Sequence, residues 1–208
     1  DIDFFVNRIE CYNPLTSENL IKMSQKVTEV TKDILPDQKI DCVVYGCTSG
    51  TIAAGHNSIE QKIKLAKPET KVTTPSTAAI KALKKLKIQK LFIFTPYSKR
   101  LNDEVVEYFK KENFNVTSNS YFDIETDIDI GKVDQNYLYE VLSKIDLKDA
   151  DALFVSCTAL PVLSIIDKLE KKLNKPVLSS NQALIWDTLE NIGKNNSVHG
   201  FGKLFLAN

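Results

Sequence analysis

Two cysteines in this sequence stand where an apolar segment gives way to small residues. Cys47 follows the run "VVYG" and precedes Thr-Ser-Gly, and Cys157 follows "LFVS" and precedes Thr-Ala. A cysteine that only fills the core would sit inside an apolar run, as Cys42 does. Because a thiolate is both a nucleophile and a base, a cysteine held at such an exit can attack a substrate or move a proton.

The residues after each cysteine favour the binding of an anion. We expect each cysteine to lie at the carboxyl end of a strand and directly before a helix, where backbone N–H groups are unpaired. Thr48, Ser49 and Thr158 are small enough to let a substrate carboxylate reach those groups. The positive end of each helix is also expected to lower the pKa of its thiol below the usual value of about 8.5. A lone cysteine at a strand end is usually an inert small residue, but two in matching contexts favour a reactive pair.

Other polar or reactive side chains have a structural explanation available. Tyr97, in "TPYS", follows another apolar run and either points its hydroxyl into the same crevice or packs as an ordinary tyrosine. The segment "SSNQ", Ser179 to Gln182, can be a helix N-cap and nothing more. Cys11 and Cys42 lack the strand-exit context, so we interpret them as core or surface residues. His56 is expected to be a solvated helix residue rather than a base.

Strands alternate with helices along the chain. Short apolar runs predict buried strands in "IDCVVYG", "KLFIFT" and "DALFVS", and apolar residues three and four positions apart predict helices between them. One continuous helix is expected from Ser17 until Pro36 stops it. Another is expected from near Ala53 to Ala66, and a later one carries a stripe that starts at Val162. The segment "DIETDIDIGKV" is expected to be a polar loop. This order predicts an α/β fold with parallel sheets covered by helices.

The pattern of a strand, a Cys-Thr pair and a helix occurs twice, which predicts two similar α/β lobes. The first lobe is expected to comprise residues 1–73 and 183–208, and the second residues 74–182. Ligands of parallel α/β sheets bind at the carboxyl ends of the strands. The active site is therefore expected in the crevice between the lobes, with Cys47 on one side and Cys157 on the other.

Composition and charge argue against several classes of function. Of the 208 residues, 43% are apolar, and the 27 basic and 27 acidic residues balance, so no net field attracts nucleic acid or an anionic membrane. No apolar run approaches the roughly 20 residues of a membrane-spanning helix, and "DIDFFVNRIE" lacks the pattern of a signal peptide. The four cysteines form no CxxC pair and the two histidines lie far apart, so no metal site is expected. We expect a cytoplasmic protein with free thiols.

The motifs "YGCTSGT", "TPYS", "SCTALP" and "KPVLSSNQALIWD" resemble those of the aspartate/glutamate racemase superfamily. The chain is most similar to the branch that holds maleate cis-trans isomerase, arylmalonate decarboxylase and the ectoine-utilisation racemase-like proteins. The segments "NPLTSENL", "VTTPSTAAI" and "GFGKLF" favour the ectoine-utilisation type. Classical glutamate racemases differ, because an Asn follows their first motif cysteine.

This resemblance implies an enzyme that needs no cofactor and acts beside a carboxylate. It assigns the two catalytic thiols to Cys47 and Cys157, and the carboxylate-binding loop to Thr48 and Ser49. Tyr97 matches a family tyrosine that is expected to hydrogen-bond the substrate carboxylate or an enediolate. Relatives also carry a strand and an Asn-bearing loop ahead of the segment that "DIDFFVNRI" resembles. We therefore expect either a chain that is incomplete at its start or a differently built pocket wall.

Because both cysteines are present, the resemblance favours a racemase, an epimerase or another isomerase of a small amino or dicarboxylic acid. The ectoine-utilisation motifs suggest a role in ectoine or hydroxyectoine breakdown. In that hypothesis one thiolate removes the proton alpha to a carboxylate and the other thiol returns a proton to the opposite face. Three alternatives stay open: a maleate cis-trans isomerase that works by cysteine addition, an arylmalonate-type decarboxylase, and a non-catalytic carboxylate-binding protein. A small carboxylate and further copies of the chain, in a homo-oligomer, are the expected partners.

Overall fold

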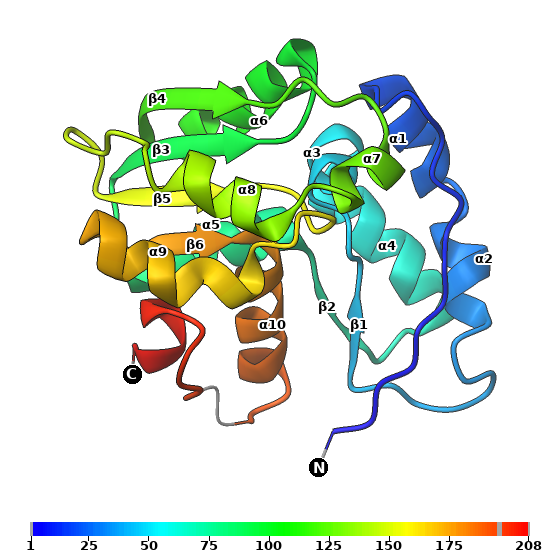
Figure 1. Ribbon diagram of the computed structural model, residues 1–208. Helices are drawn as coiled ribbons and strands as arrows, with labels where there is room; N and C mark the ends of the chain where they lie inside the picture. The colour runs from blue at the N-terminus through cyan, green and yellow to red at the C-terminus, as the bar shows by residue number, and fades with distance from the viewer. Residues whose placement is uncertain (1, 195–196, 208) are drawn as a thin grey trace.

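The chain forms two parallel sheets (Figure 1). The computed structural model describes residues 2–194 and 197–207, so residues 1, 195–196 and 208 of the predicted first lobe lie outside the described part. The small sheet pairs β1, Cys42–Val44, with β2, Lys71–Thr73. The large sheet has the order β4-β3-β5-β6. Its strands are β3, Lys90–Thr95, β4, Asn115–Tyr121, β5, Ala152–Val155, and β6, Val177–Ser179. All pairings are parallel, which confirms the predicted α/β fold with parallel sheets.

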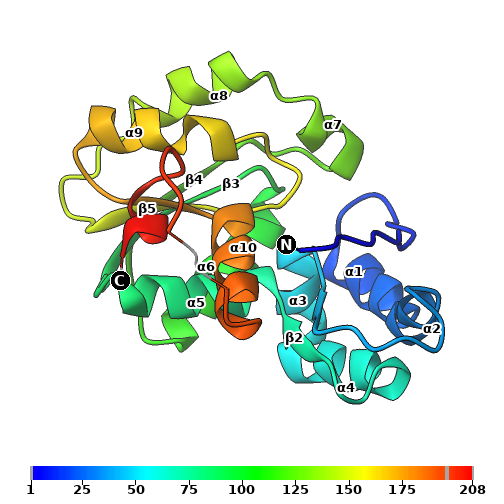
Figure 2. The same ribbon diagram turned by 90° about the horizontal axis from the view of Figure 1, so that it is seen from below.

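Helices cover both faces of the large sheet. The α-helices of the described residues are α1, Ser17–Ser24, α2, Val27–Lys32, α3, Thr48–Ala54, α4, His56–Ala66, α5, Pro75–Lys85, α6, Lys99–Lys111, α7, Asp127–Gly131, α8, Gln135–Leu142, α9, Ile166–Leu173, and α10, Ser180–Asn191. α8 and α9 lie on one face of the large sheet, and α5 and α6 lie on the other (Figures 1 and 2). Every residue of β5 is buried as a result. Within the described ranges, the chain contains no helix with the length and apolar character that crossing a membrane requires.

α10 connects the two sheets. It packs against α5 and against β1, β2 and β6, so it contacts a strand of each sheet. Its N-cap is Ser179, whose side chain accepts a hydrogen bond from the backbone of Gln182 while the Gln182 side chain bonds back to the cap. The predicted N-cap in "SSNQ" is confirmed. β1 and β2 belong to one sheet and β3 to β6 to the other, while the lobe boundaries near residues 74 and 183 stay a prediction.

Two predicted helices are each divided in the structure. The helix expected from Ser17 to Pro36 is broken at Gln25 and Lys26, whose N–H groups bond to carbonyls three residues back instead of four. The helix expected from Ala53 to Ala66 is preceded by α3 and begins at His56. Gly55 separates α3 from α4 with a φ of 81°, a conformation that glycine adopts readily.

The segment "DIETDIDIGKV" was expected to be a loop, and this expectation is wrong in part because the segment contains α7. The side chain of Thr126 accepts a hydrogen bond from the backbone N–H of Asp129 and caps this short helix. The backbone N–H of Leu15 also donates to the carbonyl of Glu125 at 2.8 Å. α7 is therefore fastened beside the segment that precedes α1 (Figure 1).

Candidate active site

The two cysteines and Tyr97 come together at the carboxyl ends of three strands. Cys47 follows β1, Tyr97 follows β3 and Cys157 follows β5. The hydroxyl of Tyr97 makes a side-chain hydrogen bond with Cys157 and another with Ser49, and it also feels the charge of Cys47. Tyr97 is only 1% exposed. The side chain of Tyr97 is packed, and its hydroxyl is directed toward the cysteines.

Cys47 is the N-cap residue of α3. Its sulfur accepts a hydrogen bond from the backbone N–H of Gly50 at 3.3 Å and lies 3.9 Å from the hydroxyl oxygen of Ser49. This is the position expected from the sequence, because the strand ends in small residues that start a helix. A sulfur anion at this place would be stabilised by the same N–H group.

Cys157 does not lie directly before a helix, and that part of the prediction is wrong. The chain continues after it as a turn, and the 3₁₀ segment Leu163–Ile165 and α9 begin only later. Cys157 has a φ of 94°, and its sulfur accepts a hydrogen bond from the backbone N–H of Ala159 at 3.4 Å. The turn thus supplies the donor that a helix was expected to supply.

Both thiols have a raised pKa, which corrects the expectation of activated thiols. Burial raises the pKa of Cys47 to about 12, although the hydrogen bond from Gly50 acts in the opposite direction. Burial likewise raises the pKa of Cys157 to about 11, opposed chiefly by the hydrogen bond with Tyr97. Loss of water around the sulfur therefore outweighs the local N–H groups. In the free protein at neutral pH both cysteines are thiols.

Several hydrogen bonds join the loops that carry the cysteines. The hydroxyl of Thr48 donates to the hydroxyl oxygen of Ser180 at 2.9 Å, and the backbone N–H of Cys157 donates to the same oxygen at 3.1 Å. On the other side, the hydroxyl of Thr158 donates to the carbonyl of Gly46 at 2.8 Å. Two of the hydroxyls that were predicted to bind a carboxylate are thus used to join the facing loops.

Ser180 and Asn181 were missed as site residues. The amide of Asn181 donates to the carbonyl of Thr158 at 2.9 Å, and Ser180 bonds to residues on both sides of the crevice. Both belong to "SSNQ", which the sequence explained as an N-cap. That segment also follows the carboxyl end of a strand and carries small polar side chains. The same pattern in the sequence singled out the two cysteines. His56, by contrast, contacts Thr74 at 3.2 Å and stays outside this group.

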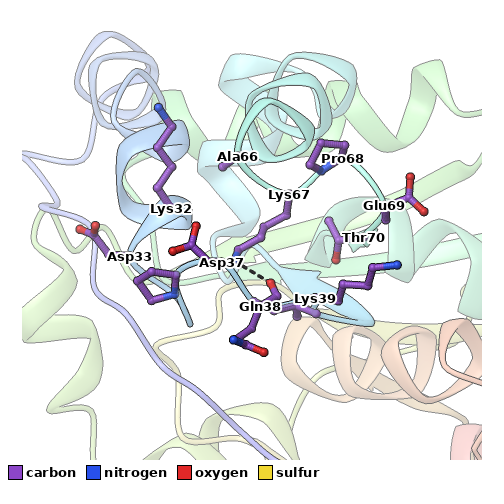
Figure 3. A pocket seen from close by; sticks show the side chains of 12 residues that line it. Lys32, Asp33, Asp37, Gln38, Lys39, Ala66, Lys67, Pro68, Glu69 and Thr70 are labelled. Atoms are coloured by element: carbon purple, nitrogen blue, oxygen red, sulfur yellow. Dashed lines mark hydrogen bonds between the residues drawn. The ribbon is translucent and has the colours of Figure 1, made fainter.

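An open hollow in the surface is lined by residues that include no cysteine (Figure 3). It has a volume of about 460 Å³, and its lining includes Ile40 and Thr70, which precede β1 and β2. The cysteines, in contrast, follow the carboxyl ends of the strands. The ammonium group of Lys67 donates to the carbonyls of Leu35 and Gln38 at 2.7 and 2.9 Å. These bonds hold the loop before β1 and assign no chemistry to the hollow.

Within the described ranges, no group of three His, Cys, Asp or Glu side chains is arranged to hold a metal ion.

The two cysteines follow strands of different parallel sheets and lie beside Tyr97 in an α/β fold. Residues 53–205 match the family described as arylmalonate decarboxylase (Amdase). Because this match covers most of the 208 residues, the chain belongs to that family.

Similar proteins in this family include isomerases. The maleate isomerase of Geobacillus stearothermophilus is 26% identical over 198 residues, which make up 91% of this chain and 78% of that protein. The maleate isomerase Iso from Pseudomonas putida S16 has the same fold, with a TM-score of 0.90 and 24% identity, over 98% of this chain and 84% of that one. The expectation of an isomerase from this branch of the superfamily is confirmed.

A further solved structure bears on cysteine chemistry in a relative. It is a cysteine-to-serine mutant of the Nocardia farcinica maleate cis-trans isomerase with a covalently bound succinylcysteine intermediate. Its TM-score is 0.89 at 20% identity, and the match covers 98% of this chain and 85% of that one. In that relative, a cysteine other than the mutated one carries the intermediate.

Proposed function

We propose that this protein is a cis-trans isomerase of a small unsaturated dicarboxylate such as maleate, and that it works by cysteine addition. The observation that carries the proposal is the pair of cysteines after β1 and β5, Cys47 half-buried and Cys157 buried, with the Tyr97 hydroxyl bonded to Cys157 and influenced by the charge of Cys47. The succinylcysteine found in the Nocardia farcinica relative supports an adduct of this kind.

Cys47 is the proposed nucleophile. Its sulfur lies at the start of α3, where it accepts a hydrogen bond from the backbone N–H of Gly50. The sulfur forms a bond to one alkene carbon while the electron pair of the double bond moves toward the adjacent carboxylate. Because burial disfavours the free thiolate, the Cys47 proton passes to solvent water as the substrate binds, and the Cys47 thiolate released at the end of the reaction takes a proton back from water when the product leaves.

Cys157 is the proposed acid and base. Its thiol gives a proton to the second alkene carbon, which leaves a succinyl thioether on Cys47 with a single carbon–carbon bond. Rotation about that bond is then free, and the Cys157 thiolate removes the proton again. The double bond re-forms in the trans arrangement as the carbon–sulfur bond breaks, so the reaction consumes neither water nor an oxidant. The Tyr97 hydroxyl, bonded to Cys157, stabilises that thiolate.

Ser49 and Tyr97 are the proposed contacts of a substrate carboxylate. Both are buried beside the sulfurs and bond to each other in the free protein. A contact by Thr48 or Thr158, as the sequence predicted, requires their hydroxyls to leave Ser180 and Gly46. Carboxylate binding by either threonine would therefore compete with the bonds that join the facing loops.

Racemisation alpha to a carboxylate is the second candidate. It is favoured by the same arrangement, because each sulfur has its own backbone N–H donor, Gly50 for Cys47 and Ala159 for Cys157. A two-base mechanism needs two such sulfurs on opposite faces of the substrate. The role in ectoine breakdown that the sequence suggested gains no support from the relatives named above.

The test is incubation of the protein with maleate, with formation of fumarate followed by NMR. We expect conversion by the wild type, none by Cys47→Ser, and a slow reaction by Cys157→Ser with a mass increase of one maleate on Cys47. Cys42→Ser, at a half-buried thiol outside the crevice, is the matched control and should retain activity. Two results together would establish racemisation instead. The wild type would form no fumarate, and the two site mutants would each exchange the alpha hydrogen of an amino or hydroxy acid for deuterium in opposite stereoisomers.

A homo-oligomer and a cytoplasmic location are part of the same proposal. Both stay predictions from the sequence. Light scattering on the purified chain and fractionation of cells that produce it would test them.

A further inference from the structure

Tyr45 carries a buried hydroxyl that has no function in the arrangement described so far. The residue follows β1, its side chain is 7% exposed, and its hydroxyl oxygen has no hydrogen-bond partner among the described residues. Burial without a partner costs folding free energy, and such groups are few in native proteins. A hydroxyl kept under these conditions calls for a partner that is present only during function.

The environment of Gly50 shows where this hydroxyl points. A Cβ atom added to Gly50 would lie 2.8 Å from the Tyr45 hydroxyl oxygen and 2.9 Å from the Cys47 sulfur. The hydroxyl and the sulfur therefore approach the same point over the first turn of α3. The next atom at this point is the methyl carbon of Met23, at 3.0 Å, which cannot accept a hydrogen bond. Of the two atoms that share this point with the Tyr45 hydroxyl, the Cys47 sulfur is the one that can accept a hydrogen bond.

The other cysteine already has a tyrosine partner. Cys157 combines a backbone donor, the Ala159 N–H, with the hydroxyl of Tyr97. Cys47 has the backbone donor, the Gly50 N–H, while the nearby Tyr45 hydroxyl has no bond to any residue that the structure describes. Each sulfur thus lies beside one buried tyrosine, and one of the two pairs is incomplete.

We propose that Tyr45 is a positioning residue whose hydroxyl donates a hydrogen bond to the sulfur of Cys47 when that sulfur becomes a thiolate. A neutral thiol is a weak acceptor, whereas a thiolate accepts several bonds, so the bond forms as the negative charge develops. This inference rests on the proposed function, in which Cys47 is the nucleophile.

The electrostatic surroundings agree with a donor role for Tyr45. Burial, and then the nearby Cys47, raise the pKa of Tyr45, so the hydroxyl keeps its proton while Cys47 loses one. The other titratable groups that face Cys47 are Cys157, Cys11 and Tyr97, from other parts of the chain. The two cysteines raise the pKa of Cys47, so they cannot replace Tyr45 as stabilising partners.

The test is the pH dependence of Cys47 alkylation in Tyr45→Phe, in a Cys157→Ser background that removes the second site thiol. Labelling by iodoacetamide is quantified at Cys47 by peptide mass spectrometry. We expect the labelling curve to move to higher pH and the rate at a given pH to fall about tenfold or more, the effect of one hydrogen bond to a charged group. Thermal unfolding should stay unchanged or move to higher temperature, because the deleted hydroxyl had no partner.

Tyr137→Phe is the matched control, since it removes an exposed phenol hydroxyl from α8. It should leave the Cys47 curve in place. An unshifted curve in Tyr45→Phe would overturn the inference. Labelling does not depend on turnover, so failure of the wild type to isomerise maleate together with a shifted curve would refute the proposed function and leave the role of Tyr45 intact.

Discussion

Cys47 and Cys157 are thiols whose reactivity is restrained by burial. For each of them, desolvation is the largest influence on the pKa, and the hydrogen bonds from Gly50, Ala159 and Tyr97 only reduce its effect. A restrained thiol is protected from oxidation and stray alkylation. Its charge forms when a substrate or a neighbouring donor stabilises it, which couples reactivity to binding.

The pH dependence of thiol labelling in the free protein follows from these values. The thiolate reacts and the thiol does not, so a raised pKa means a smaller reactive fraction at neutral pH than an exposed cysteine has. The labelling rate should rise about tenfold per pH unit above neutrality. Labelling of Cys157 should level off near its pKa of about 11, whereas labelling of Cys47 should still rise toward about 12. A plateau below the usual thiol pKa of about 8.5 would contradict this account.

At the scale of elements, the site depends on the entry into α3. The chain leaves β1, passes Tyr45 and Gly46, and starts the helix with Cys47 as its N-cap. Gly50, in the first turn, lets the Tyr45 hydroxyl and the Cys47 sulfur approach the backbone closely. Gly55 then ends α3 and lets α4 take its own direction.

Gly50→Ala is expected to damage the site more than the fold. Alanine is a better helix former by about 1 kcal/mol, but its Cβ would lie within 3.0 Å of Tyr45, Cys47 and Met23 side-chain atoms, so these must move. We expect isomerase activity to fall by about 10²-fold or more, because small displacements of reacting groups reduce rates by that much. The unfolding temperature should change only modestly. Gly46→Ala, where a Cβ meets nothing within 4 Å, is the matched control. Equal activities of the two variants would refute this reading.

At the scale of the whole molecule, α10 fixes the position of one sheet relative to the other near the two cysteines. Its first residue, Ser180, bonds to Thr48 and to the backbone of Cys157. Further along, the buried Asp187 accepts hydrogen bonds from the hydroxyl of Thr73 in β2 and from Lys81 in α5. α10 therefore makes contacts with the small sheet, with a helix that covers the large sheet, and with the loops that carry the cysteines.

Asp187→Ala should loosen this attachment. The variant leaves the buried Thr73 hydroxyl unpaired, and we expect a loss of about 2–3 kcal/mol in the free energy of unfolding, measured by urea titration. Asp167→Ala breaks the more exposed pair with Lys171 on α9 and should cost less than about 1 kcal/mol. Equal losses in the two variants would show that Asp187 does not join the sheets.

Much of the architecture could be predicted from the sequence, because the signals for it are local. Buried strands appear as short apolar runs, and helices as stripes of apolar residues, so the alternation that produces parallel α/β sheets is visible in the chain itself. The exits of β1, β3 and β5 are equally local, which is why Cys47, Tyr97 and Cys157 could be named together. The resemblance to the isomerase branch rests on the same short motifs.

The direction of the thiol pKa values, the partners of Cys157 and the role of "SSNQ" were decided only by the tertiary structure. Burial of a sulfur depends on every element that packs around it, and the resulting desolvation reversed an expectation drawn from the helix ends alone. Thr48 and Ser180 are 132 positions apart and meet only because the two sheets face each other. The unpaired hydroxyl of Tyr45 has the same origin, since only the packed chain shows which polar groups lack a partner.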